Sequence, residues 1–443
     1  MDCDNQDIKV HGAKKRNPKV AIVGAGMSGI LAAIKMQEAG INDITLFEKE
    51  EDIGGTWRDN RYPGLSCDVP AHLYTYSFAP NPDYSHRYAR GSEIHAYFKR
   101  VAIEYGVYDK VRFNSQLDRS EYKNGQWSLW LSTGEKQTYD IVICASGVLH
   151  HPQYPEIDGL NDFQGGKFHT ARWDQSVGLE GKKIAVIGNG STSVQMFPTL
   201  QKKASQIRLF QRTPQWILPV FNKEYSEREK IRLRKNPWIG KLLRGFYSTL
   251  MNVTFAKPVI GNKFLQGAIS WVCKQHLESK VKDFDLREKL RPNYQALCKR
   301  LIIANGFYEA IQQPNAELIT SGIKKIETNG VLTEDGRFHE TDMWKYWMLQ
   351  EGVIGVEPDF LKTNDGKQPP VVHVDSTAPL YSDTTKKLIT EKIWGIYYKP
   401  DIEGLGVQGG TSPYIVDKHF DEVNVDPYGI KSPEYQTTEA FNE

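Results

Sequence analysis

Two short apolar runs in this chain are each followed by a glycine-rich loop, a helical pattern and a second apolar run. In the first unit, residues 19–23 lead into Gly24-Ala25-Gly26-Met27-Ser28-Gly29, and residues 44–47 end at Glu48. In the second unit, residues 183–187 lead into Gly188-Asn189-Gly190-Ser191-Thr192-Ser193, and residues 207–210 end near Arg212. Short apolar runs bounded by glycine are typical of buried strands. The pattern therefore predicts two units of strand, loop, helix and strand.

The remaining pattern predicts further elements around these two units. A helix is expected at about 92–104, where Ile94, Tyr97, Phe98 and Val101 share one face. Strands are expected near 111–113, 127–131 and 141–144, and the last is fully apolar, as in a buried parallel sheet. We expect a first domain at 18–150, a second at 151–222 with 301–342, a helical insertion at 223–300 and an atypical segment at 343–443.

The residue that ends the second strand differs between the two units. Glu48 follows Gly24 by the same number of residues as Arg212 follows Gly188. In a dinucleotide-binding unit, the glycines let the backbone approach a pyrophosphate and the residue at this offset meets the adenosine ribose. A carboxylate accepts hydrogen bonds from free ribose hydroxyls, whereas an arginine favours a 2′-phosphate. The sequence therefore predicts FAD or NAD at the first loop and NADP at the second.

Composition narrows the class of protein. The 443 residues are 40% hydrophobic and 25% charged, with a formal net charge of +2, so nothing in the bulk charge favours nucleic acid. No apolar run is long enough for a transmembrane helix or an export signal. The five cysteines form no Cys-x-x-Cys pair, so reduced thiols in a cytoplasmic protein are expected, and we expect no metal site.

Two longer motifs carry a family resemblance. Residues 54–68, from Gly54-Gly55-Thr56-Trp57 to Tyr62-Pro63-Gly64 and Asp68, resemble a flavin-proximal pattern of Baeyer–Villiger monooxygenases. Their fingerprint is matched at every fixed position by Phe163, Gly165, His169, Trp173 and Asp174. Related N-oxygenating flavin monooxygenases usually carry Tyr or Phe where this chain has Trp173. The resemblance covers residues 18–342.

The resemblance implies an α/β protein with two Rossmann-like domains, one for FAD and one for NADP(H). It implies Arg300 and Asp68 as catalytic residues, with Asp68 positioning the guanidinium, and places His169 and Trp173 in a gating role. The implied cofactor-binding residues are Gly24, Gly26, Ser28, Gly29, Glu48, Gly55, Thr56, Trp57, Tyr62, Asp68, Tyr74, Gly188, Gly190, Ser191, Thr192, Ser193, Gln195, Arg212, Thr213 and Lys299.

The implied reaction inserts one oxygen atom of O2 beside the carbonyl of a small ketone, through a C4a-peroxyflavin, and gives an ester or lactone. A fixed guanidinium suits the negative charge of the peroxide and of its adduct, because arginine stays protonated in a dry site. Two alternatives remain open: an N- or S-oxygenating flavin monooxygenase, and a flavin-binding but catalytically impaired chimera.

The second alternative, the impaired chimera, arises because the pattern changes at Met343. Residues 134–140 lead into the apolar run 141–144, and residues 336–342 repeat that lead. A second apolar strand, returning the chain to the FAD sheet, should follow Asp342. Instead the sequence reads Met343-Trp344-Lys345-Tyr346-Trp347, and later stretches such as Val407-Gln408-Gly409-Gly410 resemble an interior piece of FAD-dependent glycine and amine oxidases (DAO-type).

We therefore expect the tail not to complete the FAD sheet and residues 343–349 not to pair beside 141–144. Trp344 and Trp347 are expected to pack as an amphipathic helix or to lie loosely. A sheet that lacks a strand loses several kcal/mol when net stability is about 5–15 kcal/mol, so FAD should be held weakly.

Overall fold

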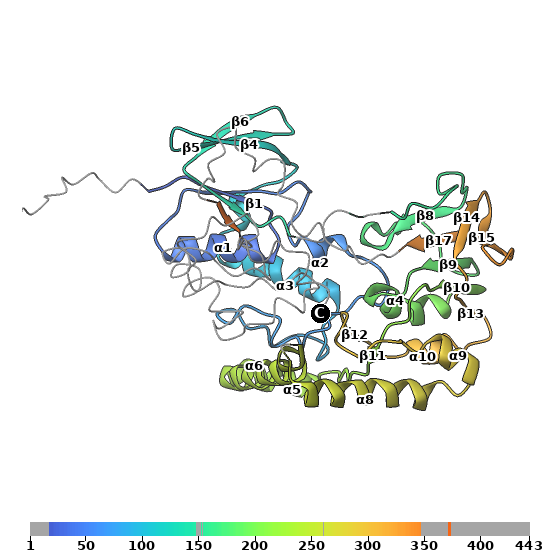
Figure 1. The fold of residues 1–443 in the computed structure, drawn as a ribbon. Coiled ribbons are helices and arrows are strands. Elements are labelled where there is room, and N and C mark those ends of the chain that lie inside the picture. The colour runs from blue at the N-terminus through green and yellow to red at the C-terminus, as the bar shows by residue number, and fades with distance from the viewer. Residues whose placement is uncertain (1–16, 148–151, 153, 260, 347–370, 374–443) are drawn as a thin grey trace, which may run out of the picture.

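The computed structural model describes residues 17–147, 152, 154–259, 261–346 and 371–373. Figure 1 shows two parallel sheets side by side, with a group of helices along one edge. The predictions for Trp347 and for most of the tail, including its DAO-type stretches, lie outside the described residues.

The first sheet is parallel and has the order β18-β7-β1-β2-β3. Strand β1 and helix α1 flank the first glycine loop, and a small antiparallel sheet of β4, β5 and β6 follows β3. The bounds are β1 Val20–Val23, α1 Met27–Glu38, β2 Ile44–Phe47, β3 Val111–Arg112, β4 Leu117–Lys123, β5 Gln126–Leu131, β6 Lys136–Tyr139, β7 Ile141–Cys144 and β18 Val371–His373.

The second sheet is also parallel and has the order β13-β10-β9-β17-β8. Strand β9 and helix α4 flank the second glycine loop, and an antiparallel sheet of β14, β15 and β16 precedes β17. The bounds are β8 Gly166–His169, β9 Lys183–Ile187, α4 Ser191–Gln201, β10 Gln206–Phe210, β13 Ala316–Ile319, β14 Ile323–Glu327, β15 Gly330–Thr333, β16 Phe338–Glu340 and β17 Met343–Tyr346.

The two sheets repeat one plan down to single hydrogen bonds. The Asp140 carboxylate accepts from the backbone N–H of Lys19 at 2.8 Å, and the Asp342 carboxylate accepts from that of Lys183 at 2.8 Å. Each Asp also donates its own N–H to the carbonyl of the same lysine at 2.9 Å. The acid therefore ties the start of the central strand, β1 or β9, to the start of its neighbour, β7 or β17.

The structure of residues 343–346 contradicts one prediction and agrees with another. They form strand β17, so the expectation of a helix or a loose segment at Trp344 is wrong. The strand pairs with β8 and β9 of the second sheet and does not pair beside 141–144, as predicted. Trp and Tyr favour strands, and a parallel strand between two others needs only its main chain to pair. A strand does follow Asp342, but it is not the expected apolar run, and it belongs to the second sheet.

Strand β18 corrects a further prediction. Residues 371–373 pair in parallel with Val142, Ile143 and Cys144 of β7. The tail thus contributes the outer strand of the first sheet, so the expectation that the tail does not complete that sheet is wrong.

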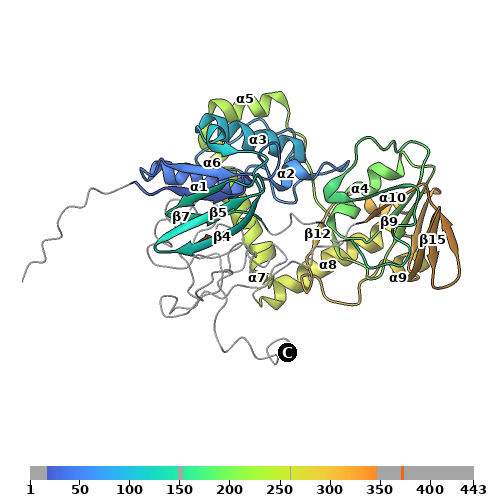
Figure 2. The ribbon, with the colours of Figure 1, turned by 90° about the horizontal axis from the view of Figure 1, so that it is seen from above.

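Helices fill most of residues 227–289 and lie along the lower edge in Figure 1. Seen from above in Figure 2, α8 runs from the middle of the molecule toward the second unit. The helices of this group are α5 Glu227–Lys235, α6 Pro237–Met251, a π-helical turn Asn252–Ala256, α7 Lys257–Val259, α8 Lys263–Lys280 and α9 Phe284–Lys289. The smaller elements are α2 Thr56–Asp59, α3 Gly91–Glu104, 3-10 turns Tyr108–Lys110 and Thr170–Arg172, β11 Ile217–Leu218, β12 Ile302–Ile303 and α10 Phe307–Ala310.

The buried apolar side chains form separate cores for the two parallel sheets. One core lies between the first sheet and helices α1 and α3, and a larger one joins β9, β10 and α4 to the helical group through Cys273, Leu277 and Leu290. Within the described ranges, the model contains no helix long and apolar enough to cross a membrane.

Candidate functional site

The first glycine loop brings backbone close to backbone. A Cβ on Gly29 would lie 2.0 Å from the carbonyl oxygen of Gly24, and one on Gly24 would lie 2.5 Å from that of Ala145. Only glycine fits such contacts. Gly26 caps α1 without a side-chain hydrogen bond, so Ser28 and its neighbours in the first turn present backbone N–H groups for an anion.

A second backbone segment lies against this loop. Gly55 precedes Thr56, the first residue of α2, and a Cβ on Gly55 would lie 3.2 Å from the Cα of Gly26. The two glycines leave a cradle that side chains would fill. The residues present therefore fit the pyrophosphate of a dinucleotide.

Glu48 ends β2 and is buried beside the same loop. Its Oε2 accepts a hydrogen bond from the backbone N–H of Ala25 at 2.9 Å, and Arg58 Nη1 lies 3.5 Å from its Oε1. Arg58 is itself only 4% exposed and is held by Asp59 and by the carbonyl of Asp52. Burial lowers the pKa of Arg58, but the hydrogen bond to Asp59 and the charges of Asp59 and Glu48 outweigh it and raise that pKa overall. The acid at the predicted ribose position is thus charge-balanced by an arginine that sequence reasoning missed.

Trp57 and Tyr74 pack together beyond the loop. Their rings meet edge to face with centroids 5.5 Å apart, and the Trp57 indole N–H donates to the Tyr74 hydroxyl at 3.1 Å. The pair joins residues 17 positions apart in sequence. A fixed aromatic wall of this kind suits a flat ring system.

The second glycine loop repeats the geometry of the first. Gly188 has a φ of +92°, and Gly190 caps α4 without a side-chain hydrogen bond, so the first turn (Ser191, Thr192, Ser193) offers backbone N–H groups. Asn189, missed in the sequence, donates to the Gln211 side chain and to the Thr213 carbonyl, both at 2.8 Å. These bonds tie the loop to the end of β10.

Arg212 follows Gln211 and lies at the surface. Gln211 is buried and donates to the carbonyl of Lys289 at 2.8 Å. Arg212 is exposed and has no hydrogen bond or ion pair with any other described residue. A guanidinium without a protein partner at the end of the second strand fits a 2′-phosphate.

The two units meet at residues 62–68. The Tyr62 hydroxyl donates to Gln195 Oε1 of α4 at 3.0 Å, and Gln195 Nε2 donates to the Ser66 carbonyl at 3.2 Å. A Cβ on Gly64, a residue of the Tyr62-Pro63-Gly64 motif, would lie 2.8 Å from the Gln195 carbonyl. The loop of the first unit therefore lies directly on the helix of the second.

Arg300 and Asp68 form an ion pair at this junction. Arg300 Nη2 lies 3.3 Å from Asp68 Oδ2, and the two side chains are 29% and 30% exposed. Burial raises the pKa of the nearby Tyr62 hydroxyl, and the charge of Asp68 adds to the rise while that of Arg300 opposes it. The junction thus places one fixed positive charge, partly open to solvent, between the two glycine-loop units.

Other predicted residues lie apart from this pair. Lys299 does not join it, because its Nζ lies 4.9 Å from the centre of the Tyr294 ring.

The fingerprint residues cluster around β8 in the second sheet. Phe163 packs in the core beneath that sheet, and Trp173 meets Phe168 edge to face at 5.2 Å. The Asp174 carboxylate accepts from Ser176 within the following turn.

His169 ends β8 and is buried. Its Nδ1 accepts a hydrogen bond from the backbone N–H of Ala171 at 3.1 Å, which caps the 3-10 turn. Burial, helped by the charge of Arg172, lowers the pKa of His169 to about 4. A Cβ on Gly165 would lie 2.2 Å from the carbonyl of Asp342, so this glycine lets β8 approach β17.

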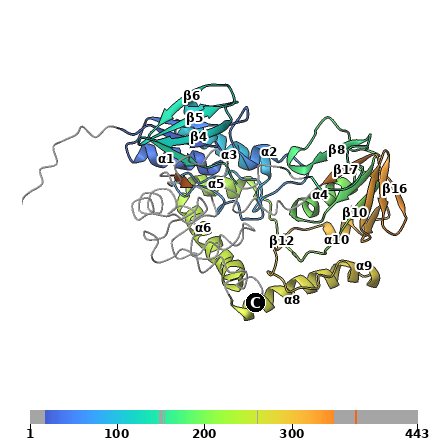
Figure 3. The same cartoon turned by 45° about the horizontal axis from the view of Figure 1, so that its top comes forward.

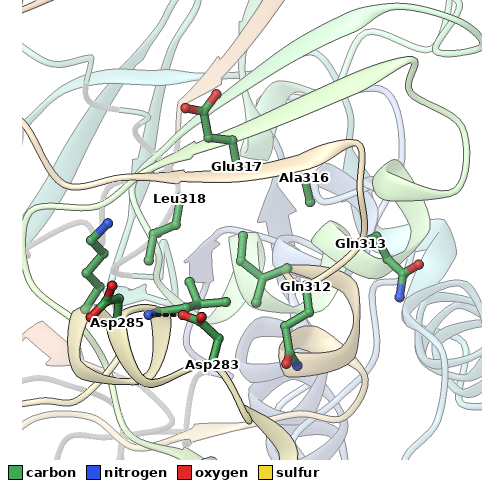
Figure 4. A pocket seen from close by; sticks show the side chains of 10 residues that line it. Asp283, Asp285, Gln312, Gln313, Ala316, Glu317 and Leu318 are labelled. Carbon is green, nitrogen blue, oxygen red and sulfur yellow. Dashed lines mark hydrogen bonds between the residues drawn. The ribbon is translucent and has the colours of Figure 1, made fainter.

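A pocket of about 430 Å³ lies away from the junction, between α9 and β13. Figure 4 shows Leu318 pointing from β13 toward Asp283 and Asp285, while the Glu317 carboxylate points to the other side of the strand. The Asp283 carboxylate caps α9 through the N–H of Leu286, and Glu317 pairs with Arg208 and Arg337. The acids serve local structure, and no predicted site residue lines this pocket.

Two parallel sheets, each with an uncapped helix behind a glycine loop, define a protein built to hold two dinucleotides. The family model described as flavin-binding monooxygenase-like matches residues 17–343. The chain belongs to the flavin-binding monooxygenase-like family, which confirms the predicted family and fold class for this part of the chain.

Individual relatives agree. The chain is 45% identical over 328 residues to an uncharacterized monooxygenase of Mycobacterium tuberculosis, covering 74% of this chain and 66% of that protein. It is 38% identical over 337 residues to a Baeyer–Villiger monooxygenase of Pseudomonas aeruginosa, covering 74% and 63%. The chain therefore spans slightly less than two thirds of the length of these relatives.

Solved structures resemble the model closely. A complex of OTEMO with FAD and NADP matches with a TM-score of 0.65 at 25% identity, covering 74% of this chain and 70% of that one. An open structure of cyclohexanone monooxygenase matches in fold with a TM-score of 0.72 at 22% identity, covering 86% of each chain.

Proposed function

We propose that this chain is a Baeyer–Villiger-type monooxygenase that depends on FAD and NADPH. It takes a small ketone and O2 and forms an ester or lactone. The observation that carries the proposal is the Arg300–Asp68 pair at the junction of the two glycine-loop units. Trp173 supports the Baeyer–Villiger reaction over N-oxygenation.

The first unit would hold FAD through its glycine loops, Glu48 and the Trp57–Tyr74 wall, and the second would hold NADP(H) through its loop and Arg212. FAD, when reduced by NADPH, supplies the activation of O2. The guanidinium of Arg300 would stabilise the negative charge that develops on the oxygen atoms at the ketone carbon. Asp68 holds the guanidinium in place, and Tyr62 and Gln195 keep the two units in register.

The domain limits expected from the sequence belong to the same proposal: 18–150 for FAD, 151–222 with 301–342 for NADP, 223–300 for the helical insertion and 343–443 for the tail. We also propose a cytoplasmic location. The described cysteines Cys67, Cys144, Cys273 and Cys298 are all free, which suits a reducing compartment.

The test uses the purified full-length chain. Its visible spectrum is measured before and after dialysis, and NADPH oxidation is followed with and without cyclohexanone as the probe ketone. We expect a flavin spectrum and caprolactone formed in step with NADPH consumption. Flavin binding with peroxide as the sole oxygen product would support the impaired chimera. Oxidation of a thioether or amine with no lactone would support the N- or S-oxygenating alternative.

A further inference from the structure

Helix α6 carries a stripe of large apolar side chains that face solvent. Trp238, Leu242, Phe246 and Leu250 follow one another at intervals of four residues and are 59, 63, 61 and 40% exposed. Side chains at this spacing lie on one face of a helix. At 1.5 Å per residue the stripe is roughly 18 Å long.

The opposite face of α6 holds the helix in place. Tyr247 and Met251 are buried, and Arg244 donates to the backbone carbonyls of Leu73 and Thr75 at 3.0 and 2.8 Å. The helix is therefore anchored to the first unit, and its exposed stripe does not result from a detached segment.

Helix α8 adds two more exposed aromatic side chains. Phe264 is 83% and Trp271 is 63% exposed, and they lie seven residues apart on the helix, about two turns. In Figure 3, α6 leads away from α5 and toward α8. Both helices belong to the layer that forms the lower edge in Figure 1.

The stretch from residue 230 to residue 277, which contains α6 and most of α8, carries charge of one sign. Between Glu229 and Glu278 the sequence contains nine Lys or Arg residues and no Asp or Glu. Lys241, Lys257, Lys263 and Lys274 are exposed and form no ion pair with other described residues. Arg234 is neutralised by Asp83 of the first unit.

We propose that the exposed face of α6 and α8 docks on the surface of a membrane that contains anionic lipids. Helices that lie in a bilayer interface combine an apolar stripe with flanking lysines, and tryptophan is enriched at that depth. The inner leaflet of a cell membrane is negatively charged, so each lysine close to it strengthens binding.

Charge and shape disfavour a second copy of this chain, and also a nucleic acid, as the partner of this face. A second copy docking through the same face would bring two sets of these exposed lysines together. A nucleic acid would engage the lysines and leave the apolar stripe in water. The bilayer surface matches both features, and it delivers an apolar ketone to a protein of the proposed function.

The test mixes the full-length protein with sedimenting vesicles of phosphatidylcholine, with or without phosphatidylserine. We expect at least about ten-fold more binding to the vesicles with phosphatidylserine, and release as sodium chloride is raised. The double variant Leu242→Gln, Phe246→Gln should bind the vesicles that contain phosphatidylserine at least about ten-fold more weakly than the original chain. Lys241→Glu should reduce binding to phosphatidylserine vesicles only.

The matched control is Ile103→Gln, which replaces an apolar side chain that is 56% exposed on helix α3. It should bind vesicles like the original chain. Circular dichroism establishes that the variants fold, and NADPH oxidation without vesicles keeps this test separate from that of the proposed function. Equal binding to both vesicle types, or no effect of the double variant, overturns the proposal. Self-association that the double variant abolishes, without vesicle binding, assigns the face to a second copy.

Discussion

The guanidinium of Arg300 lies 3.3 Å from the carboxylate of Asp68, although 232 positions separate the two residues in the sequence. Asp68 comes from the loop that follows the first glycine unit, and Arg300 from the end of the helical group. The ion pair therefore exists only when the first unit and the helices are assembled around the second.

Arg300→Ala should uncouple NADPH oxidation from ester formation. The loss of one fixed positive charge should lower ester formation about 100- to 1,000-fold, because it no longer stabilises the developing negative charge. NADPH oxidation should continue, with oxygen recovered as hydrogen peroxide, and both products are measured in one reaction. Arg337→Ala, on a surface arginine paired with Glu317, is the control and should change neither. Ester formation retained in Arg300→Ala would show that another group supplies the charge.

Arg212→Ala should change cofactor preference. The arginine has a predicted charge-assisted contact with a 2′-phosphate, so its removal should weaken NADPH binding by about ten- to a hundred-fold and leave NADH nearly unchanged. Dissociation constants for both nucleotides, from titration calorimetry, measure the change. Lys203→Ala, at an exposed lysine paired with Glu180, is the control for lost surface charge. Equal losses for the two nucleotides contradict the assignment.

Gly165→Ala should destabilise the second unit. The new Cβ would lie 2.2 Å from the Asp342 carbonyl, and backbone cannot shift there without disturbing the pairing of β8 with β17. We expect a loss of about 1–3 kcal/mol in the free energy of unfolding, measured by urea denaturation. Gly178→Ala, where a Cβ meets open space, should leave it unchanged. An unaltered midpoint in Gly165→Ala would contradict the close approach of β8 to β17 at this glycine.

The stability of the protein should fall as the pH drops from about 6.5 to about 4. His169 has its pKa lowered to about 4 by burial, so the unfolded chain binds the proton first across this interval. The stabilisation is fully present above the pKa of His169 in the unfolded chain, and it is lost as the pH falls toward the pKa of about 4 in the folded protein. His169→Asn keeps an acceptor for the Ala171 N–H and cannot titrate, so it should remove about 2–3 kcal/mol of this pH dependence. His72, whose pKa burial also lowers to about 4, should account for part of the remainder. An identical pH profile in the variant would contradict the burial of a neutral His169.

Local pattern was enough to predict the two glycine-loop units. Their strands, loops and helices are contiguous in sequence, and the apolar spacing of residues such as Ile94 and Phe98 follows directly from one buried helix face. The ends at Glu48 and Arg212 were likewise found by counting along the chain. These features depend on neighbours a few residues away.

Features that depend on distant residues escaped sequence reasoning. Strand β17 was missed because Met343-Trp344-Lys345-Tyr346 lacks an apolar run, while its partners β8 and β9 lie more than 150 residues upstream. The burial of Arg58 beside Glu48 had one signal in the sequence, an arginine among several acids. The motif marked Gly64, but nothing in the sequence pointed to its contact with Gln195, because that contact exists only where the two units meet.

The paired bonds of Asp140 with Lys19 and of Asp342 with Lys183 occupy the same position in each of the two parallel sheets. Each acid closes one copy of the same module, and the second copy is closed before Tyr346. The change in sequence pattern at Met343 therefore falls at the start of β17, the strand that the second acid ties to β9. All four residues of these hydrogen bonds precede Met343, so the start of the central strand in each sheet is fixed by residues upstream of the change in pattern.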